Sequence, residues 1–341
     1  MKQPATYYLL SEKASTLAAK LKGPIVIFGA GGFIGVNLLN SLLMIRDDVY
    51  GISQDAHNNW RFLASEVSKK NVLSCDITDS DSLREVLKKL KPKTIFNLAA
   101  YGAYSKQKEY KKIYATNFNS TVDLLEILRE QSFDAYVHAG SSSEYGLNSA
   151  EPDESGELIP NSHYAVSKTA SYAALKYFGK IEQLPVTHLR LYSAYGPWEE
   201  PDRLIPVLIA HARSGKFPPL VDPDVSRDFI YVTDVSAAFI HAAAAIKKEL
   251  YGEVFNIGTG SKTTIRKLAQ LSAKKFGIKT PAHFGKMPNR KWDVRDWYAN
   301  ISSAKKKLNW SPEVELENGL DEVRNWQEVV NFDSASWNWK K

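Results

Sequence analysis

A glycine-rich turn between an apolar strand and a helix constrains the fold of this chain more than any other stretch. The run Ile25–Phe28 has the character of a buried parallel strand, and apolar residues at helical spacing follow over residues 36–44. Between them Gly29, Gly32 and Gly35 form a G-x-x-G-x-x-G pattern. Such a turn lets the backbone approach a diphosphate, with the helix N-terminus directed at negative charge. The stretch therefore predicts a dinucleotide-binding unit.

Strands and helices alternate after this unit. Apolar runs predict strands at 49–52, 72–77, 94–100 and 135–139, with helices at 81–90 and 118–129 between them. This rhythm is typical of βαβ units and a parallel sheet. We therefore predict an α/β fold with a doubly wound parallel sheet of the Rossmann type. A preceding amphipathic helix, residues 7–22, is expected to lie against it.

Composition narrows the class of protein. With 341 residues, 44% of them hydrophobic, the chain can bury a large core. No run reaches the roughly 18 apolar residues of a membrane span, and residues 1–23 lack the order of a signal peptide, so we expect a cytoplasmic protein without a membrane segment. The single cysteine, Cys75, excludes an internal disulfide and a cysteine-based metal cluster, and no metal site is predicted. The net charge of +6 comes from scattered lysines, which are more typical of solvated faces than of a nucleic-acid site.

The end of the second strand should distinguish NAD from NADP. An acidic residue there would accept hydrogen bonds from the adenosine ribose and repel a 2′-phosphate. The chain has Ser53-Gln54-Asp55 at this place, without the usual carboxylate, and Arg61 lies several residues further on. These residues leave the choice between NAD and NADP open.

Small polar residues follow the strand at 135–139. The segment Gly140-Ser141-Ser142-Ser143-Glu144-Tyr145-Gly146 begins at the carboxyl edge of the predicted sheet, where open α/β sheets bind ligands. A serine-rich loop without a catalytic role is the alternative interpretation.

The helix that begins near residue 164 carries a tyrosine and a lysine on one face. Tyr164 and Lys168 are four residues apart, so the ammonium can lie close to the phenol and favour its ionised form. A phenol with a lowered pKa can act as a general acid or base. An isolated pair of this kind is usually a surface pair. The glycine turn, the strands and the serine loop that precede it favour a catalytic role.

With these features in this order, the chain resembles the extended short-chain dehydrogenase/reductases, the family of nucleotide-sugar epimerases and dehydratases. The resemblance covers residues 23 to about 330. Besides the segments already quoted, the matching stretches are Asn97-Leu98-Ala99-Ala100, Asn117, Leu189-Arg190-Leu191-Tyr192-Ser193-Ala194-Tyr195-Gly196-Pro197, Arg227-Asp228-Phe229-Ile230-Tyr231-Val232 and Phe255-Asn256-Ile257-Gly258-Thr259-Gly260.

The resemblance implies roles for individual residues. Tyr164 would be the catalytic acid or base, Lys168 would orient the nicotinamide ribose and lower the tyrosine pKa, and Ser141 would hydrogen-bond the reacting sugar oxygen. Asp76 would lie near the adenine amine of a bound NAD(P). The cofactor-binding residues would be Gly29, Gly32, Phe33, Ile34, Gly35, Ser53, Gln54, Asp76, Ile77, Leu98, Ala99, Ala100, Asn117 and Lys168.

The resemblance also divides the chain into parts. We expect an N-terminal helical extension at 1–22, a Rossmann domain at 23–190 and about 225–260, and a smaller nucleotide-sugar-binding α/β domain at 191–224 and 261–341. Either Arg290 or Arg295 would contact the substrate diphosphate, because the family's usual Arg-Pro-Gly-Asp is here Arg290-Lys291-Trp292-Asp293. The expected substrate-binding residues are Ser142, Ser143, Tyr192, Ser193, Arg227 and Arg290.

The implied activity is hydride transfer at C4 of a nucleotide sugar through a 4-keto species. A 4-epimerase is the first expectation, and a 4-keto-sugar reductase or C4 dehydrogenase is the alternative. A 4,6-dehydratase is disfavoured, because serines Ser142 and Ser143 occupy the positions of its acidic residues and Glu144 is displaced by one. A non-catalytic nucleotide-binding module is also disfavoured, since such proteins usually lose the tyrosine or the lysine.

Relatives of this kind pair two helices across a two-fold axis, so we expect a homodimer. The corresponding helices begin near Asn117 and Tyr164. Their apolar stripes are expected to contact both the sheet and a partner. The residues of these stripes are Leu124, Leu125, Leu128, Ala174, Leu175 and Phe178.

Overall fold

A parallel sheet forms the centre of the molecule. The structure is a computed structural model that describes residues 8–65, 67–104, 106–286 and 294–330. Seven strands lie in the order β10-β6-β5-β4-β1-β2-β3, and every neighbouring pair is parallel. They are β1 (Ile25–Phe28), β2 (Val49–Ser53), β3 (Val72–Ser74), β4 (Thr94–Asn97), β5 (Ala135–Ser141), β6 (Val186–Leu191) and β10 (Val254–Ile257). This confirms the predicted Rossmann-type fold.

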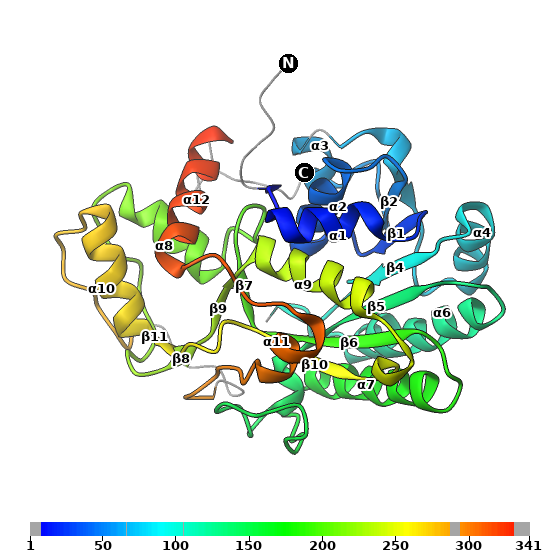
Figure 1. Cartoon of the computed structure of the whole chain (residues 1–341). Helices are drawn as coiled ribbons and strands as arrows, with labels where there is room; N and C mark the ends of the chain where they lie inside the picture. Colours follow the sequence, from blue (N-terminus) through cyan, green and yellow to red (C-terminus); the bar gives the residue numbers. More distant parts are fainter. Residues whose placement is uncertain (1–7, 66, 105, 287–293, 331–341) are drawn as a thin grey trace.

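Helices cover both faces of this sheet (Figure 1). One face carries α1 (Glu12–Lys20), α2 (Phe33–Leu43), α9 (Val232–Ala245) and α11 (Ser302–Leu308), and the other carries α4 (Ser80–Leu90), α6 (Ser120–Arg129) and α7 (His163–Lys180). Strand β1 shows how the two layers share one strand. Ile25 and Ile27 pack into the core on the first face, while Val26 and Phe28 pack into the core on the second. Alternation along the strand thus requires an apolar residue at every position.

A smaller lobe lies at one end of the sheet, on the left in Figure 1. It contains α8 (Leu204–Ala212), α10 (Ile265–Phe276), α12 (Leu316–Val329) and the antiparallel pair β8 (Ser226–Arg227) with β11 (Thr263–Thr264). The parallel pair β7 (Ser193–Tyr195) with β9 (Phe229–Tyr231) connects it to the sheet. The lobe has its own core cluster, whose buried members include Tyr195, Leu208, Tyr231, Leu268 and Val323.

Two strands are shorter than predicted. Strand β3 ends at Ser74 instead of residue 77, because Asp76 turns the chain by accepting hydrogen bonds from the backbone and side chain of Thr78. Strand β4 ends at Asn97 instead of residue 100, because the Asn97 side chain accepts the N–H of Ala99. In both cases a side chain replaces the strand's ladder bonds.

Helix boundaries also differ from the prediction. The helix expected from residue 118 begins earlier, as α5 (Tyr110–Tyr114), and continues through a π-helical turn, η3 (Ala115–Asn119), into α6. Asn117 therefore lies inside a helix instead of opening one. The N-terminal helix α1 begins at Glu12, after Ser11 caps it by accepting the N–H of Ala14.

Cys75 lies just after β3 in the core of the second face, and burial raises the pKa of its thiol to about 11. Cys75 therefore packs as a small apolar residue. Over the described ranges of the chain, no helix combines the length and apolar character needed to cross a bilayer.

A buried aspartate fastens the last part of the chain to the sheet-covering helix α9. The carboxylate of Asp234 accepts the backbone N–H groups of Glu313 and Val314, both at 3.0 Å. The Asp234 carbonyl accepts the indole N–H of Trp310 at 3.1 Å. These three bonds hold the segment that leads into α12.

We expect Asp234→Ala to lower the free energy of unfolding by roughly 2–4 kcal/mol, because it leaves two N–H groups without their acceptor. Urea unfolding followed by circular dichroism measures the change. The matched control is Asp224→Ala, whose exposed carboxylate pairs with surface arginines, at 3.3 Å from Arg266 and 4.0 Å from Arg295. Equal losses in the two variants would contradict the anchoring role of Asp234.

Candidate active site

Two glycines at the junction of β1 and α2 lie where the backbone leaves no space for a side chain. Gly29 has a φ of +75°, and a Cβ there would lie 2.5 Å from the Ala99 nitrogen. A Cβ on Gly35 would lie 2.3 Å from the Gly29 oxygen. Helix α2 begins at Phe33 after Gly32, which provides no capping side chain, so its first N–H groups face the turn. This cradle fits the diphosphate of a dinucleotide.

Residues expected at the adenosine end of the cofactor lie together. The Gln54 amide donates to the Asp76 carboxylate at 2.8 Å, and Ser53 ends the neighbouring strand β2. Ile77 is buried beside them in the second core. Arg61, the nearest arginine after Gln54 along the chain, is 6% exposed and bound elsewhere. Arg61 is therefore not placed to receive a 2′-phosphate.

The loop that carries Trp198 is tied to three earlier parts of the chain. Arg61 donates to the carbonyls of Trp198 and Gly31 and pairs with Glu200 at 2.9 Å. The Trp198 indole donates to the hydroxyl of Tyr8, and the Asn37 amide, in α2, donates to the carbonyl of Pro197 at 2.9 Å. Trp198 is 1% exposed, which makes it a packing residue.

The segment after β4 borders the same cradle. The Leu98 N–H donates to Phe28 at the end of β1, and Ala99 and Ala100 follow. Asn117 supports this segment from behind: its side chain accepts the N–H of Tyr101 and donates to the Tyr101 carbonyl and to Ser167 of α7, at 2.8 to 2.9 Å. Because Asn117 is fully buried, it positions the loop and α7 instead of facing the cradle.

The three residues predicted to be catalytic come together at the carboxyl end of β5. Ser141 is the last residue of β5, and Tyr164 and Lys168 lie in the first two turns of α7. Ser141 hydrogen-bonds the Tyr164 hydroxyl. The Lys168 ammonium donates to the Ala139 carbonyl at 2.8 Å and is 1% exposed.

The charges at this site differ from the sequence expectation in one respect. Burial raises the pKa of Tyr164 to about 12, although Ser141 and Arg203 act in the opposite direction. Lys168, which was expected to lower this pKa, is not among the groups that shift it. Burial also lowers the pKa of Lys168 to about 8, against the effect of Glu144. Tyr164 and Lys168 therefore share one face of α7, but Lys168 does not shift the pKa of Tyr164.

The serines after Ser141 lie at the mouth of the same site. Ser142 is 5% exposed, and Ser143 is half-buried and donates its N–H to the Ser141 hydroxyl at 3.1 Å. Glu144 points away from the site, toward His188 and Arg190 of β6. No carboxylate from this turn therefore faces the place where a sugar would bind.

The residues expected to bind substrate lie where the smaller lobe meets the sheet. The buried Tyr192 hydroxyl has no hydrogen-bond partner among the described residues. Ser193 is half-buried in β7. Arg227 lies 5.1 Å from the ring of Trp297. Arg295 is 77% exposed beside Asp224. Arg290 falls outside the described residues.

Sequence reasoning missed two residues of this region. Asp228 is fully buried and accepts the N–H groups of Thr259, Gly260 and Ala299, so it shapes the loop after β10. Its position directly after Arg227 in a quoted motif was the available signal. Arg203, at the N-terminus of α8, acts electrostatically on Tyr164, and no local pattern indicated this.

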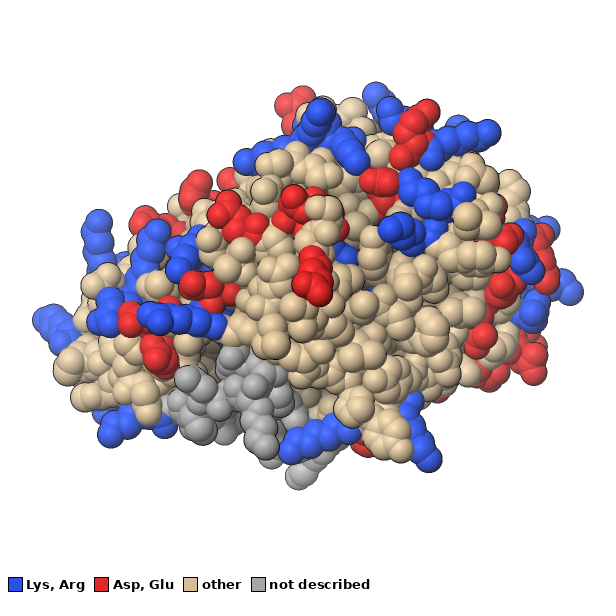
Figure 2. Space-filling view, turned by 90° about the horizontal axis from the view of Figure 1, so that it is seen from below, with Lys and Arg blue, Asp and Glu red and all other residues tan. Residues whose placement is uncertain are grey.

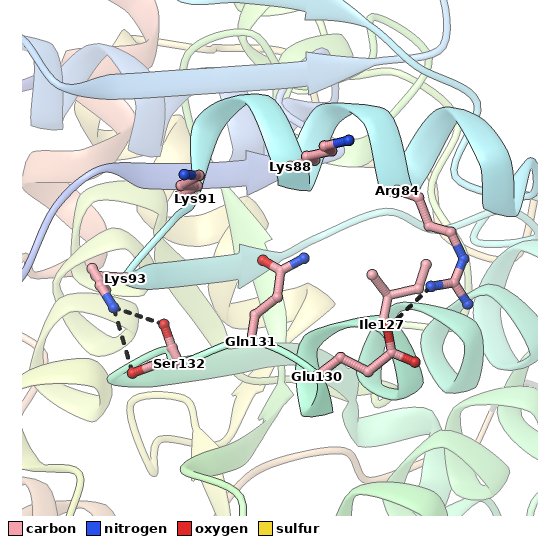
Figure 3. Close-up of a pocket in the computed structure, with 8 residues that line it drawn as sticks. All are labelled: Arg84, Lys88, Lys91, Lys93, Ile127, Glu130, Gln131 and Ser132. Carbon is pink, nitrogen blue, oxygen red and sulfur yellow. Dashed lines mark hydrogen bonds and ion pairs between the residues drawn. The ribbon is translucent and has the colours of Figure 1, made fainter.

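A hollow away from the candidate site, shown in Figure 3, lies between the C-terminal ends of α4 and α6 and has a volume of about 490 Å³. Lys93 precedes β4 and donates to the carbonyl of Ser132 at 2.8 Å. The hollow is therefore at the amino edge of the sheet, opposite the edge that carries Ser141. It is lined by Arg84, Lys88, Lys91, Lys93, Ile127, Glu130, Gln131 and Ser132.

Fold and site together define a nucleotide-binding protein of the Rossmann type with a serine, a tyrosine and a lysine at its centre. The model of the NAD dependent epimerase/dehydratase family matches residues 25–258. The chain belongs to this family.

Individual relatives agree with that assignment. The chain is 29% identical to UDP-glucuronate 4-epimerase 4 of Arabidopsis thaliana, over 89% of this chain and 74% of that protein. It is 30% identical to an uncharacterized UDP-glucose epimerase of Bacillus subtilis, over 87% and 95% of the two chains. Among solved structures, UDP-glucose 4-epimerase of Thermotoga maritima with UDP-glucose has a TM-score of 0.81 at 25% identity, covering 90% of this chain and 99% of that one. UDP-glucuronic acid 4-epimerase of Bacillus cereus, in complex with UDP-glucuronic acid and NAD, has a TM-score of 0.78 at 26% identity, with 90% and 99% covered.

Replacing Lys168 separates its role in the site from its role in the fold. We expect Lys168→Met to weaken NAD binding at least about tenfold without lowering the unfolding midpoint, because the buried ammonium is itself costly to desolvate. Calorimetric titration with NAD and thermal unfolding measure the two effects. The control is Lys176→Met, an exposed lysine on the same helix. Unchanged NAD affinity in Lys168→Met would remove the lysine from the cofactor site.

Proposed function

We propose that the protein is an NAD-dependent 4-epimerase of a UDP-linked sugar. The observation that carries the proposal is the meeting of Ser141, Tyr164 and Lys168 at the carboxyl end of β5. The glycine turn that fits a dinucleotide follows β1 at the same edge of the sheet. The relatives whose names specify UDP-glucose or UDP-glucuronate 4-epimerases support the reaction and the nucleotide.

The residues of the site suit proton transfer at a secondary alcohol. Tyr164 takes the proton of the C4 hydroxyl and later returns one, while Ser141 holds the same sugar oxygen by a hydrogen bond. NAD held at the turn around Gly29 and Gly35 would supply the acceptor and donor of the C4 hydride, and its positive charge would favour the ionised form of Tyr164. Return of the hydride to the opposite face of the 4-keto sugar would invert the configuration at C4, and the sugar would undergo no net oxidation or reduction.

The cofactor proposed is NAD in preference to NADP. The cradle around Gly29 and Gly35 fits a diphosphate, which both cofactors carry. Arg61 is occupied by Trp198, Gly31 and Glu200, which favours the cofactor without a 2′-phosphate.

A single cysteine suits a reducing compartment, and the cytoplasm is the location we propose.

We propose the smaller lobe as the nucleotide-sugar-binding domain, with 191–224 and 261–341 as its expected range. Strand β8 lies in the lobe although it falls outside this range, and α11 falls inside the range although it packs on the sheet. Ser142 and Ser143 would contact the sugar, and Tyr192 and Ser193 would lie beside it. Arg227, held by Trp297, is the proposed partner of the diphosphate. The hydroxyls of Ser142 and Ser143 cannot replace the carboxylic acid of a 4,6-dehydratase, and the buried Glu144 does not face the site.

Incubation with NAD and either UDP-glucose or UDP-glucuronate tests the proposal. We expect each active substrate to give a mixture with its 4-epimer, resolved by anion-exchange chromatography, and Tyr164→Phe to lose at least about a hundredfold in turnover. The control Tyr251→Phe removes a hydroxyl from a half-buried position shortly before β10. Net oxidation or reduction of the nicotinamide cofactor in proportion to product would indicate a dehydrogenase or reductase instead. The alkaline absorbance of a 4-keto-6-deoxy sugar would indicate a dehydratase. Either result, or near-normal turnover in Tyr164→Phe, would contradict the proposal.

A homodimer through α7 is part of the proposed function. The stripe residues Leu124, Leu125, Leu128, Leu175 and Phe178 are all buried in the protein's own core, so they do not serve a partner as expected. Exposed apolar residues remain on and just after α7, with Val166 39%, Tyr177 47% and Ile181 69% exposed. The face seen from below, where α7 lies in Figure 1, has a broad area without charged side chains (Figure 2). Exposed apolar residues of this kind suit a two-fold contact.

We expect Ala173→Arg, at an exposed position of α7, to convert the dimer into a monomer, because it places two arginines at the two-fold contact. Analytical ultracentrifugation at micromolar concentration measures the change. The matched control Ala64→Arg is exposed on α3 (Trp60–Ala64) and should leave the dimer intact. A monomeric wild-type protein, or a dimeric Ala173→Arg variant, would contradict this arrangement.

A further inference from the structure

Glu144 is a fully buried carboxylate three residues after Ser141, in the short helix η4 (Ser142–Tyr145). Its Oε1 accepts the backbone N–H of Ser141 at 2.8 Å. The Ser141 hydroxyl in turn accepts the N–H of Ser143 at 3.1 Å. These reciprocal bonds form a capping box, so the carboxylate closes the turn that presents Ser141.

Strand β6 holds the same carboxylate from the other side. His188 Nε2 lies 2.7 Å from Oε1, and Arg190 Nε donates to Oε2 at 2.7 Å. Arg190 also donates to the Tyr145 hydroxyl, which donates to Asn256 of β10, each at 2.8 Å. Groups on β5 and β6 therefore bind Glu144 directly, and Tyr145 of η4 and Asn256 of β10 support Arg190 behind it.

The sequence leaves space for this arrangement at Gly140. A Cβ at that position would lie 2.1 Å from His188 Nε2 and 2.6 Å from Glu144 Oε1. The residue before Ser141 thus lacks a side chain where the histidine and the carboxylate meet.

Glu144 also acts on the two site residues of α7 through its charge. Burial lowers the pKa of Lys168, and the negative charge of Glu144 opposes this effect. The same charge adds to burial in raising the pKa of Tyr164. Burial alone would raise the pKa of Glu144 itself, but His188 and Arg190 bring it below its usual value, so the carboxylate is ionised at neutral pH.

We propose that Glu144 is a positioning residue, whose carboxylate fixes Ser141 at the end of β5 and whose negative charge acts on Lys168, which is bound two residues earlier on the same strand at the Ala139 carbonyl. The inference rests on the proposed function for the reaction that Ser141 and Lys168 serve. Because Glu144 is fully buried and paired, it does not touch the substrate. The competing explanation is that Glu144 serves only to neutralise the buried Arg190.

Other titratable groups around Glu144 do not account for a pH effect near neutrality. Burial lowers the pKa values of His138 and His188, so both imidazoles are already neutral at the pH where an exposed histidine is half protonated. The titratable and charged groups that face Glu144 or its partners are His138, Tyr145, Glu154, Tyr164, Lys168, Tyr172, His188 and Arg190.

Two substitutions separate the position of the carboxylate from its charge. Glu144→Gln keeps the length and removes the charge, so we expect turnover to fall at least about tenfold and both limbs of the pH–rate profile to move to lower pH by about one unit, with KM changed less than about threefold. Glu144→Asp keeps the charge and shortens the side chain, which cannot then reach Ser141 and Arg190 together. We expect it to lose turnover without a shift of the profile.

A measurement that needs no turnover accompanies them. Nuclear magnetic resonance of protein labelled with carbon-13 at lysine Cε follows the titration of Lys168, identified by the signal missing in Lys168→Met. We expect Lys168 to titrate at lower pH in Glu144→Gln than in the wild type. This titration tests the inference even if the wild-type protein fails to epimerise UDP-sugars, so the two failures are distinguishable.

A double variant tests the competing explanation and covers the case in which Glu144→Gln does not fold. Glu144→Gln/Arg190→Met removes both buried charges and should restore folding. We expect its turnover and the titration pH of Lys168 to remain low. Recovery of both to wild-type values, or an unshifted Lys168 titration in either folded variant, would overturn the proposal.

Discussion

Parallel pairing of β1, β4, β5 and β6 is the constraint on which the rest of the molecule depends. Phe28 at the end of β1 pairs with Asn97 at the end of β4, and Ser141 at the end of β5 pairs with Leu191 at the end of β6. Parallel strands all finish at the same edge, so the segments that follow them meet although they are far apart in the sequence. The glycine turn, the serine turn and Tyr192 share one edge for this reason.

Buried polar side chains turn this shared edge into fixed geometry. Asn117, Glu144 and Asp228 are fully buried, and each binds backbone N–H groups of a loop that borders the site. A buried amide or carboxylate is costly unless its hydrogen bonds are made, so each of these residues strongly favours a single loop conformation.

The sequence predicted the parts of the molecule that depend on local pattern. The glycine turn, the alternation of strand and helix, and the shared face of Tyr164 and Lys168 all follow from spacing within a few residues. The hydrogen-bond partners of individual side chains could not be predicted in this way, because they come from distant parts of the sequence. Lys168 bonds the Ala139 carbonyl, and Arg61 pairs with Glu200. The apolar stripes of α6 and α7 gave a similar limit. Periodicity identified the apolar face, but it could not show that the protein's own core covers all of it except Ala174.

The loop at Pro197 and Trp198 has a consequence for recombination between relatives. Its three anchors, Tyr8, Asn37 and Arg61, belong to the N-terminal segment, to α2 and to α3, whereas the loop itself leads into the smaller lobe. The loop therefore packs against the first part of the chain, although in the sequence it belongs to the segment that leads into the smaller lobe. A chimera that exchanges only residues 191–224 would separate the loop from the three side chains that bind it. A grafted loop would need to bring matching partners from the first 61 residues of its own parent.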